Sequence, residues 1–467
     1  MSSDPQTHQE TYRLIVTRRG AAELLLHADG TTQRLPKVNV RTGKRLAVEL
    51  TWTLRNDFGL EAWCLFVPRF CCGPSNATHP RYVVMESVGQ SGNAPRSTSW
   101  VSTTSAAGKA SLPDDEADHL QSALEEMGGY VAEPQKHPFA RPGWITELFK
   151  WTQSQIDPLQ LTLTGGFRQL NASPSFSLVR IETTGPAFWF KATGEPNRHE
   201  LAITCTLTRL FPSYLPELLS VRPPWNGWLS RECPGRTLDT HTDASAWTQT
   251  ARALGALEIA SIGKSETLLA CGCKDLRLSA LAGQIDPFFA RMIERMRLQK
   301  SEPPAILSNS DIRFLRDELK RACTIVQQIG LPDVLGHIDF NPGNIVISAE
   351  KSVFLDWAEG SLVSPFITFS YLREHARRSP FGAAGTQDQI ARAYLDSWRP
   401  WLSRSALVRG MACSSFLAVF LYALAIDQQN SGGAAESPAL SGFLRSLARR
   451  MHREAAAIKA GGELCRH

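Results

Sequence analysis

The sequence predicts an α+β protein of two or three domains, because strand-like and helical segments occupy different parts of the chain. Apolar runs bounded by turns fill residues 12–88 and occur again between 159 and 191, where strands are expected. Residues 244–459 are mainly helical in pattern, apart from two short apolar runs at 345–347 and 353–355. The chain has 467 residues, 43% of them hydrophobic, which is enough for sizeable cores.

The composition and the first residues exclude several classes of protein. The N-terminus is polar and lacks the basic-then-apolar layout of a signal peptide, so we expect a cytoplasmic location. The ten cysteines show no paired C-x-x-C spacing and are expected to be reduced thiols. A net charge of +5, spread along the chain, does not indicate a nucleic-acid partner. No membrane partner is expected, because the apolar run at 410–426 is shorter than the roughly 20 residues of a spanning helix and predicts a buried core helix.

The first domain is expected over residues 1–156 and has an α/β pattern. A helical run at 46–58 separates its strand-like segments, and helices at 115–127 and 144–156 close it. This domain resembles the Nudix fold in register. The turn residues of the Nudix box have counterparts at Leu35-Pro36, Gly43 and Gly59-Leu60.

The chemical positions of the Nudix box have changed. Its first glutamate falls on Lys44, and of its acids only Asp57 remains. Nudix hydrolysis needs several carboxylates on one helix face to hold a divalent metal at a diphosphate. The resemblance therefore implies a Nudix-like scaffold that is not catalytic. The alternative is an unrelated α/β domain.

A lysine at a strand end marks the next part of the chain. Strands are expected at 159–163, 176–182 and 187–191, and Lys191 ends the last of them. A charge on a buried strand is costly unless it is paired, so Lys191 needs a partner. The alternative is that the lysine extends along the strand end to solvent.

The segment 331–372 carries the most informative motif. It reads H-x-D-x-x-x-x-N at His337, Asp339 and Asn344, and the two short apolar runs then lead to Asp356. This layout predicts a loop, a hairpin and a second acidic turn. Carboxylate and amide oxygens are the hard ligands that Mg²⁺ prefers, and the arrangement suits phosphoryl transfer. The alternative is that these residues only form turns.

This segment resembles the aminoglycoside phosphotransferase and choline kinase family, whose members have a protein-kinase-like fold. The family's H-G-D-x-x-x-x-N is matched except that Ile338 replaces the usual glycine. The resemblance implies that Asp339 is the catalytic base and that Asn344 and Asp356 are magnesium ligands. It further implies that His337 braces the loop.

The same resemblance implies a two-lobed phosphotransferase domain behind the Nudix-like domain. Its small lobe is expected over 157–233, and its helical large lobe over 234–467 with the catalytic loop at 335–360. Lys191, paired with Glu200, would hold the phosphates of ATP or GTP. A small-molecule hydroxyl acceptor would receive the phosphate. The alternative is a pseudokinase or a nucleotide-binding regulatory protein with an N-terminal interaction module.

The charge of the C-terminal part bears on the acceptor. Beyond Gly360 the sequence has thirteen basic and seven acidic residues, a balance of +6. A site for a polycationic aminoglycoside should instead be rich in carboxylates. We therefore expect a neutral or anionic acceptor, with Arg373, Arg377 and Arg378 as the residues to test. The alternative is that these arginines lie on an outer, solvated face.

Overall fold

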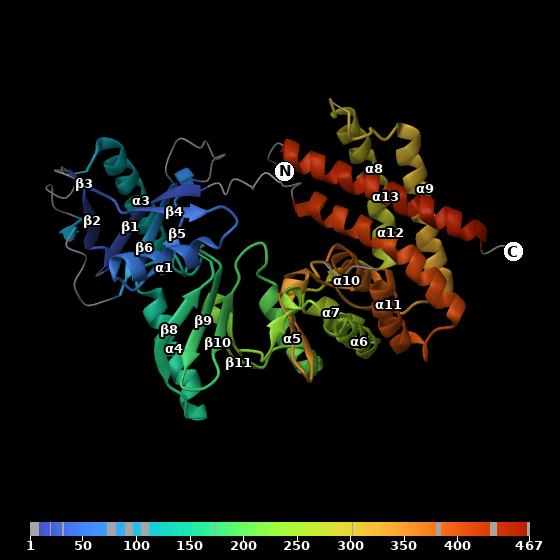
Figure 1. The fold of residues 1–467 in the computed structure, drawn as a ribbon, viewed down its shortest axis with the longest axis horizontal. Helices are drawn as coiled ribbons and strands as arrows, with labels where there is room; N and C mark the ends of the chain where they lie inside the picture. The colour runs from blue at the N-terminus through green and yellow to red at the C-terminus, as the bar shows by residue number, and fades with distance from the viewer. Residues whose placement is uncertain are drawn as a thin grey trace. The chain divides into compact units, whose positions relative to one another are not determined.

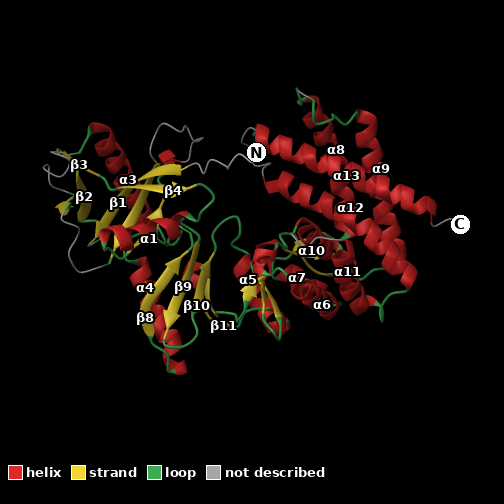
Figure 2. Cartoon of the chain, in the orientation of Figure 1, coloured by secondary structure: helices red, strands yellow, loops and turns green. Residues whose placement is uncertain are grey.

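The computed structural model describes residues 9–18, 20–29, 32–71, 81–88, 97–103, 112–171, 173–300, 302–379, 384–429 and 437–464. The chain divides into two compact units. Unit 1 comprises Met1–Leu201 and Glu217–Glu232, and unit 2 comprises Ala202–Pro216 and Cys233–His467. Most strands belong to unit 1 and most helices to unit 2 (Figure 1, Figure 2), so the predicted α+β class is confirmed.

Unit 1 begins with a mixed seven-stranded sheet. Its order is β3-β2-β1-β6-β5, with β4 paired to β1 and β7 to β2, and only the β1–β6 pair is parallel. The strands are β1 (Gln9–Arg18), β2 (Glu23–Asp29), β3 (Thr32–Arg34), β4 (Lys37–Arg41), β5 (Ala62–Phe66), β6 (Arg81–Ser87) and β7 (Thr98–Ser102). The helices that accompany the sheet are α1 (Leu46–Phe58), α3 (Asp114–Ala132) and α4 (Trp144–Ile156).

Both faces of this sheet are covered, as the alternation of side chains along β1 shows. Leu14 and Val16 join the cluster that contains the buried residues of α1. Ile15, which points to the opposite face, joins the cluster that contains the buried residues of α3 and α4. Because successive strand residues face opposite sides, a chain that buries all three must lie between two helical layers.

A second, five-stranded antiparallel sheet completes unit 1. Its order is β11-β12-β10-β9-β8. The strands are β8 (Leu163–Gln169), β9 (Ser177–Thr183), β10 (Phe188–Ala192), β11 (Leu218–Arg222) and β12 (Gly227–Arg231). The strand predicted at 159–163 was misplaced. Residues Asp157–Leu159 form a 3₁₀ turn with Pro158 near its start, and Gln160, at φ 58°, breaks the extended chain before β8 begins.

The two sheets of unit 1 share one hydrophobic cluster. Phe139 and Trp144 lie in it with Phe190 of β10 and Trp225, which precedes β12. The ring of Phe139 is 5.2 Å from that of Trp144, 6.2 Å from that of Phe190 and 5.6 Å from that of Trp225, centroid to centroid. The division predicted near residue 157 stays a prediction. The seven-stranded sheet lies before residue 157 and the five-stranded sheet after it, while side chains from both segments pack in one cluster.

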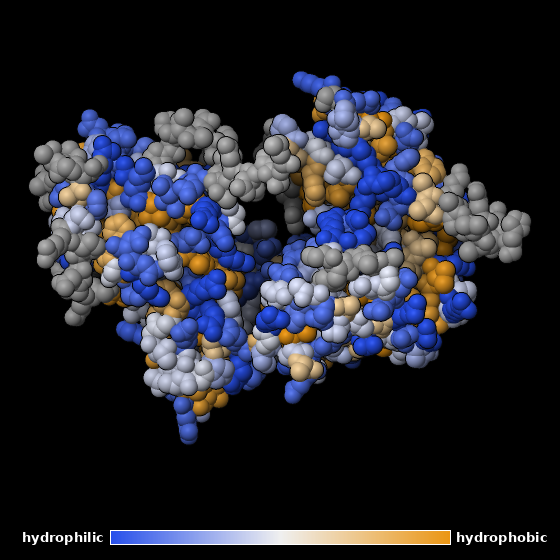
Figure 3. Space-filling model, in the orientation of Figure 1, coloured by the Kyte–Doolittle hydropathy of each residue, from blue (hydrophilic) through white to orange (hydrophobic). Residues whose placement is uncertain are grey.

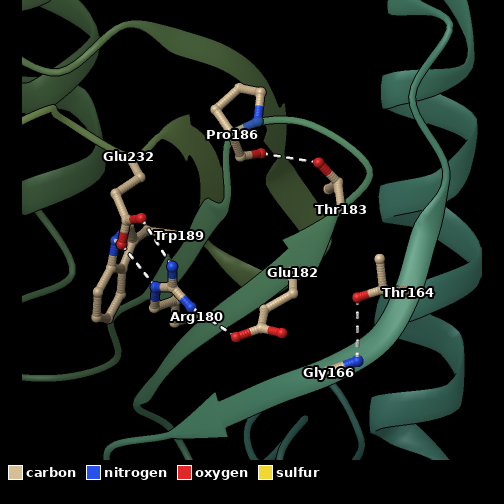
Figure 4. Close-up of polar contacts among 8 residues, drawn as sticks. All are labelled: Thr164, Gly166, Arg180, Glu182, Thr183, Pro186, Trp189 and Glu232. Carbon is tan, nitrogen blue, oxygen red and sulfur yellow. Dashed lines mark hydrogen bonds and ion pairs between the residues drawn. The ribbon is translucent and has the colours of Figure 1, made fainter.

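A polar network fixes the end of the five-stranded sheet (Figure 4). Arg180 of β9 binds both carboxylate oxygens of Glu232, at 2.6 and 2.8 Å, and also reaches Glu182 at 2.9 Å. The indole of Trp189 on β10 donates to the same Glu232, at 3.0 Å. The hydrogen bonds from Arg180 lower the pKa of Glu232. The network therefore joins β9 and β10 to the residue that ends unit 1.

Unit 2 consists of helices around two small three-stranded sheets. The sheets have the orders β13-β16-β17 and β14-β18-β15. Their strands are β13 (Arg236–Thr237), β14 (Lys274–Asp275), β15 (Val334–His337), β16 (Ile345–Ile347), β17 (Ser352–Phe354) and β18 (Gly360–Val363). The helices are α5 (Glu200–Leu210, of which the first two residues belong to unit 1), α6 (Ala244–Ala260), α7 (Ser265–Ala270), α8 (Leu278–Arg297), α9 (Asn309–Ile329), α10 (Ile367–Arg378), α11 (Ala384–Trp398), α12 (Arg404–Gln429) and α13 (Pro438–Leu464).

The apolar run at 410–426 lies in α12, where a core helix was expected. The helix is long and apolar enough to span a bilayer, yet 67% of its most apolar window is buried inside the protein. Phe416, Phe420 and Leu424 belong to the main cluster of unit 2. Strongly hydrophilic side chains gather instead on the visible face of this unit over α13 (Figure 3).

The shared cluster of unit 1 gives a first prediction. Trp144 is fully buried, so Trp144→Ala should lower the free energy of unfolding of unit 1 by about 3 to 5 kcal/mol. Hydrogen exchange of the amides of β10 and β12 in urea measures this opening separately from unit 2. The matched control is Trp52→Ala, because Trp52 is 62% exposed on α1, and it should change stability by less than about 0.5 kcal/mol. Equal effects of the two substitutions would contradict the shared core.

Candidate active site

The predicted catalytic segment forms a loop and a hairpin that leave β15 and return to β18. The two strands pair antiparallel, with His337 opposite Gly360. Between them β16 and β17 form the hairpin, with Ile345 opposite Phe354. Asn344 therefore stands opposite Leu355, whose amide donates to the Asn344 carbonyl at 2.8 Å. This register places Asn344 opposite the residue before Asp356, at the open end of the hairpin.

His337 connects the two halves of this segment. Its ring Nε2 lies 3.1 Å from the carbonyl oxygen of Leu355, and its backbone amide donates to the hydroxyl of Thr368 at 3.0 Å. The side chain is buried, and burial lowers its pKa, which keeps the ring neutral. Because a carbonyl can only accept, the ring proton sits on Nε2. His337 thus fixes the start of the loop against the residue just before Asp356.

Asp339 is exposed between two buried neighbours. Ile338 and Phe340 are 4% and 2% exposed and belong to the main cluster of unit 2. They anchor the loop on both sides, and the side chain of Ile338, at the family's glycine position, is accommodated in the core. The Asp339 carboxylate accepts a hydrogen bond from the side-chain amide of Asn341 at 3.4 Å. The side-chain amide of Asn344 donates to the backbone carbonyl of Asp339, also at 3.4 Å.

Asp356 has a backbone conformation that is rare for a residue with a side chain. Its φ and ψ are 61° and 63°, in the left-handed region. Such a conformation costs on the order of 1–3 kcal/mol and persists only where the surroundings enforce it. The following Trp357 is buried and donates its indole N–H to the Phe354 carbonyl at 3.1 Å. The turn thereby holds the exposed carboxylate of Asp356 in place.

The oxygens of Asn344 and Asp356 fit a magnesium ion that arrives with a nucleotide. Within the described ranges, no group of three or more His, Cys, Asp or Glu residues is placed to hold a metal. Mg²⁺ commonly needs only one or two protein ligands, because phosphate oxygens and water complete its shell. A two-ligand site beside an exposed carboxylate is therefore compatible with Mg²⁺ on the nucleotide phosphates.

Lys191 and Glu200 form an ion pair within unit 1. The Lys191 Nζ lies 2.5 Å from the Glu200 Oε1. Their side chains are only 14% and 2% exposed. Lys191 also lies over the rings of Phe176 and Trp228, at 5.9 and 5.7 Å from their centroids. The structure thus brings together the two residues that the family resemblance paired, while their role toward a nucleotide stays a prediction.

A cavity of about 510 Å³ opens beside Asp339 within unit 2. The loop at 338–341 forms one side, and α10, α12 and α13 form the rest. Three of its arginines, Arg373, Arg377 and Arg378, were singled out from the sequence. Sequence reasoning did not single out four further charged residues that line it, which are Glu374, Arg450, Arg453 and Glu454. The spacing of Glu374 to the two following arginines was a visible signal, whereas no local pattern links α10 to α13.

Comparison with known proteins gives structural neighbours only. No protein-family model matches the chain, and no curated protein matches its sequence. Similar solved structures include an ethanolamine kinase from Plasmodium vivax, with 13% identity and a TM-score of 0.44 over 65% of this chain and 85% of that one. A choline/ethanolamine kinase family protein from Mesorhizobium loti has 15% identity and a TM-score of 0.44, over 67% and 99% of the two chains.

A macrolide 2'-phosphotransferase from Brachybacterium faecium has 17% identity and a TM-score of 0.43, over 65% of this chain and 98% of that one. The neighbours are thus small-molecule kinases and phosphotransferases, which are the proteins that the resemblance of segment 331–372 indicated. At these scores they carry no weight for the activity. The function has to follow from the residues of the site.

Glu374 is the centre of the charged wall of the cavity. Its carboxylate binds Arg377 at 2.9 Å, Arg378 at 2.7 Å and Arg450 at 3.3 Å. The Glu374 side chain is 16% exposed, whereas those of Arg377 and Arg378 are 63% and 60% exposed. Burial alone would raise the pKa of Glu374. The hydrogen bond from Arg377 and the charges of the three arginines prevail and lower that pKa to about 2.

The uncharged side of the cavity is formed by His375 and aromatic residues. Burial and the nearby charge of Arg378 lower the pKa of His375, so its ring is neutral at pH 7. Tyr371 is held in place by a hydrogen bond of 2.8 Å from its hydroxyl to the Ala418 carbonyl. Tyr422 and Phe443 complete the aromatic lining. The cavity therefore combines an arginine wall, an apolar wall and the carboxylate of Asp339.

The depressed pKa of Glu374 gives a pH prediction. A carboxylate whose pKa is lowered by folding contributes stability above its unfolded pKa of 4.5, and this contribution is lost as the pH falls toward 2. Glu374→Gln should therefore be less stable than the parent protein at pH 7, by about 1–3 kcal/mol. The difference should shrink between pH 4.5 and 2.

Thermal melting of both proteins across this pH range is the measurement. Glu294→Gln is the matched control, since Glu294 also lies one turn before an arginine but is 66% exposed. A difference in melting temperature between the Glu374 variant and the parent protein that stays the same at every pH would contradict the assignment.

Proposed function

We propose that this protein is a phosphotransferase that moves the γ-phosphate of ATP or GTP to a hydroxyl of a small molecule. The observation that carries the proposal is the placement of Asp339. Its exposed carboxylate stands at the cavity of unit 2, while the hairpin register sets Asn344 opposite Leu355, the residue before Asp356, in the same segment. A base, an acceptor cavity and two oxygen ligands are the parts that phosphoryl transfer needs.

In the proposed reaction, Asp339 accepts the proton of the acceptor hydroxyl as the hydroxyl oxygen attacks the γ-phosphorus. The bond between the γ-phosphorus and the β–γ bridging oxygen breaks, and ADP or GDP leaves. Its position beside the cavity and between the buried Ile338 and Phe340 supports this role, because a base must be held within reach of the proton it removes. His337 acts indirectly. Its hydrogen bond to the Leu355 carbonyl holds the loop of Asp339 against the residue that precedes Asp356.

The nucleotide would be held by residues of two kinds. Asn344 and Asp356 would bind Mg²⁺, which when present neutralises charge on the phosphates and aligns them. Lys191 would bind the phosphates directly. The Glu200 carboxylate orients that ammonium group and offsets the cost of its burial. We place these residues in a protein-kinase-like fold with two lobes, in which residues 157–233 form the small lobe and residues 234–467 the large lobe.

The acceptor is proposed to be neutral or anionic rather than an aminoglycoside. Five arginines and three carboxylates line the cavity, a balance of +2, and His375 is neutral. A polycationic acceptor would meet repulsion there. The presence of Asp339, Asn344, Asp356 and Lys191 argues against the alternative of a nucleotide-binding protein without transferase activity.

The proposal predicts different defects for two carboxylates. Asp339→Asn should lower the transfer rate by roughly two to four orders of magnitude while the nucleotide still binds, because only the base is lost. Asp356→Ala should instead abolish Mg²⁺-dependent nucleotide binding. ADP formation against a panel of hydroxyl compounds and nucleotide binding by calorimetry measure the two effects. Asp396→Asn is the control, because Asp396 is 52% exposed on α11. An Asp339→Asn protein with full activity would refute the assignment.

The N-terminal region is proposed to be a Nudix-like scaffold without hydrolase activity. The helix α1 at the box position carries only two acids, Glu49 and Asp57. The protein should therefore not hydrolyse nucleoside diphosphate sugars with Mg²⁺ or Mn²⁺, as measured by release of nucleoside monophosphate. A turnover that disappears with Asp57→Ala and persists with Asp339→Asn would show an active hydrolase instead.

A further inference from the structure

We infer that the acceptor of this site carries a phosphate group, and that Arg377, Arg378 and Arg450 bind it. The inference rests on the proposed function, because it names the class of acceptor that the cavity beside Asp339 takes. It goes further because it assigns binding of the phosphate group to three arginines from α10 and α13, two helices that are distant in the sequence.

The three guanidinium groups are brought together by one carboxylate. Arg377 and Arg378 lie one turn after Glu374 on α10, and Arg450 reaches the same carboxylate from α13. All four residues line the cavity that also contains Asp339. The pairs with Arg377 and Arg378 join neighbours one turn apart on one helix, whereas the contact with Arg450 is built by tertiary packing.

The cluster holds more positive charge than its own carboxylate can balance. Three guanidinium groups surround one carboxylate, which leaves an excess of +2 within the cluster. Like charges this close repel one another unless a counter-charge is near. Asp339, Arg373, Arg453 and Glu454 also line the cavity, but these two carboxylates and two arginines cancel, so the excess of +2 remains.

The arginines retain hydrogen-bond donors for a ligand. Each guanidinium has five N–H groups, and the bonds to Glu374 use two nitrogens of Arg377 and two of Arg378. With 63% and 60% of these two side chains exposed, their remaining donors are accessible from the cavity. Glu374 thus holds the groups in position and leaves a forked set of donors free.

A phosphate monoester fits this cluster better than the other classes of acceptor. It carries close to two negative charges at neutral pH and three strong acceptor oxygens, which matches an excess of +2 and several guanidinium forks. A carboxylate supplies half of that charge, and a cation such as an amino-alcohol would be repelled. The cavity of about 510 Å³ is within the range of small-molecule sites and has room for a sugar or polyol phosphate.

The test compares matched pairs of compounds with the full-length protein in the absence of nucleotide. Ribose 5-phosphate is compared with ribose, and glycerol 3-phosphate with glycerol, by calorimetry at low and high salt. Inorganic phosphate and sulfate serve as probes for the anion alone. We expect each phosphorylated compound to bind at least tenfold more tightly than its neutral partner. We also expect this preference to fall as salt is raised.

Variants connect the binding to the cluster. Arg378→Gln and Arg450→Gln should each weaken the binding of the phosphorylated compounds by about tenfold or more, because a charge-assisted hydrogen bond is lost. Arg450→Lys keeps the charge without the fork and should lose less. Arg297→Gln is the matched control, since Arg297 is 59% exposed on α8 and pairs with Glu294 one turn away. It should leave the binding unchanged.

The outcomes separate this inference from the proposed function. If phosphorylated compounds bind through these arginines, but neither ADP from ATP nor GDP from GTP forms with them or with the panel of hydroxyl compounds, the cluster is an anion site and the proposed transferase function fails. If ADP forms with neutral acceptors and the arginine variants act like the control, the function stands and the inference is overturned. It is also overturned if neither inorganic phosphate nor any phosphorylated compound binds in a way that depends on Arg378 and Arg450.

Discussion

The antiparallel register of the hairpin β16–β17 is the constraint on which the arrangement of the site depends. With Ile345 opposite Phe354, the residue before one strand and the residues after the other meet at the open end of the hairpin. A slip of one residue would turn every side chain of one strand to the other face. The register is held by buried side chains of both strands and by the His337 ring, which binds the carbonyl of Leu355. The positions of Asn344 and Asp356 are thus set by apolar packing outside the polar residues themselves.

Strain is concentrated where this hairpin ends. Asp356 adopts left-handed backbone angles that a residue with a side chain takes only at a cost. The buried Trp357, which is hydrogen-bonded to Phe354, supplies the surroundings that enforce them. Because its surroundings fix the backbone of this turn, the Asp356 carboxylate is held in one position. This rigidity is what a metal ligand with few companions requires, because Mg²⁺ tolerates little distortion of its geometry.

Local patterns in the sequence predicted much of this structure. The helices at 46–58 and 144–156 lie at the predicted residues, since their apolar spacing and flanking turns are local signals. The cost of burying a charge predicted that Lys191 has a partner, and the family resemblance indicated Glu200. Helices α7 and α10 have weaker local signals. The first has only six residues, and the second lies directly behind a strand without a capping signal in its sequence.

What the sequence could not show was contact between distant segments. Arg450 reaches Glu374 across 76 positions of the chain, and a single sequence contains no trace of such a contact. The count of basic residues beyond Gly360 pointed to a positive large lobe, but it could not tell which arginines share a cavity. Charge is a property of composition, whereas a binding site is a property of packing.

The common core of the two sheets in unit 1 has a consequence for how this protein moves. Phe190 lies in that core, and Lys191 follows it on the same strand with its side chain on the opposite face. Segments that share a core tend to open together as one cooperative unit. Fluctuations of the N-terminal sheet are therefore transmitted to the strand that carries the lysine. A small molecule or mutation that loosens the contact of Phe139 with Phe190 would therefore disturb the position of Lys191 through the opposite face of its strand, without contacting the lysine itself.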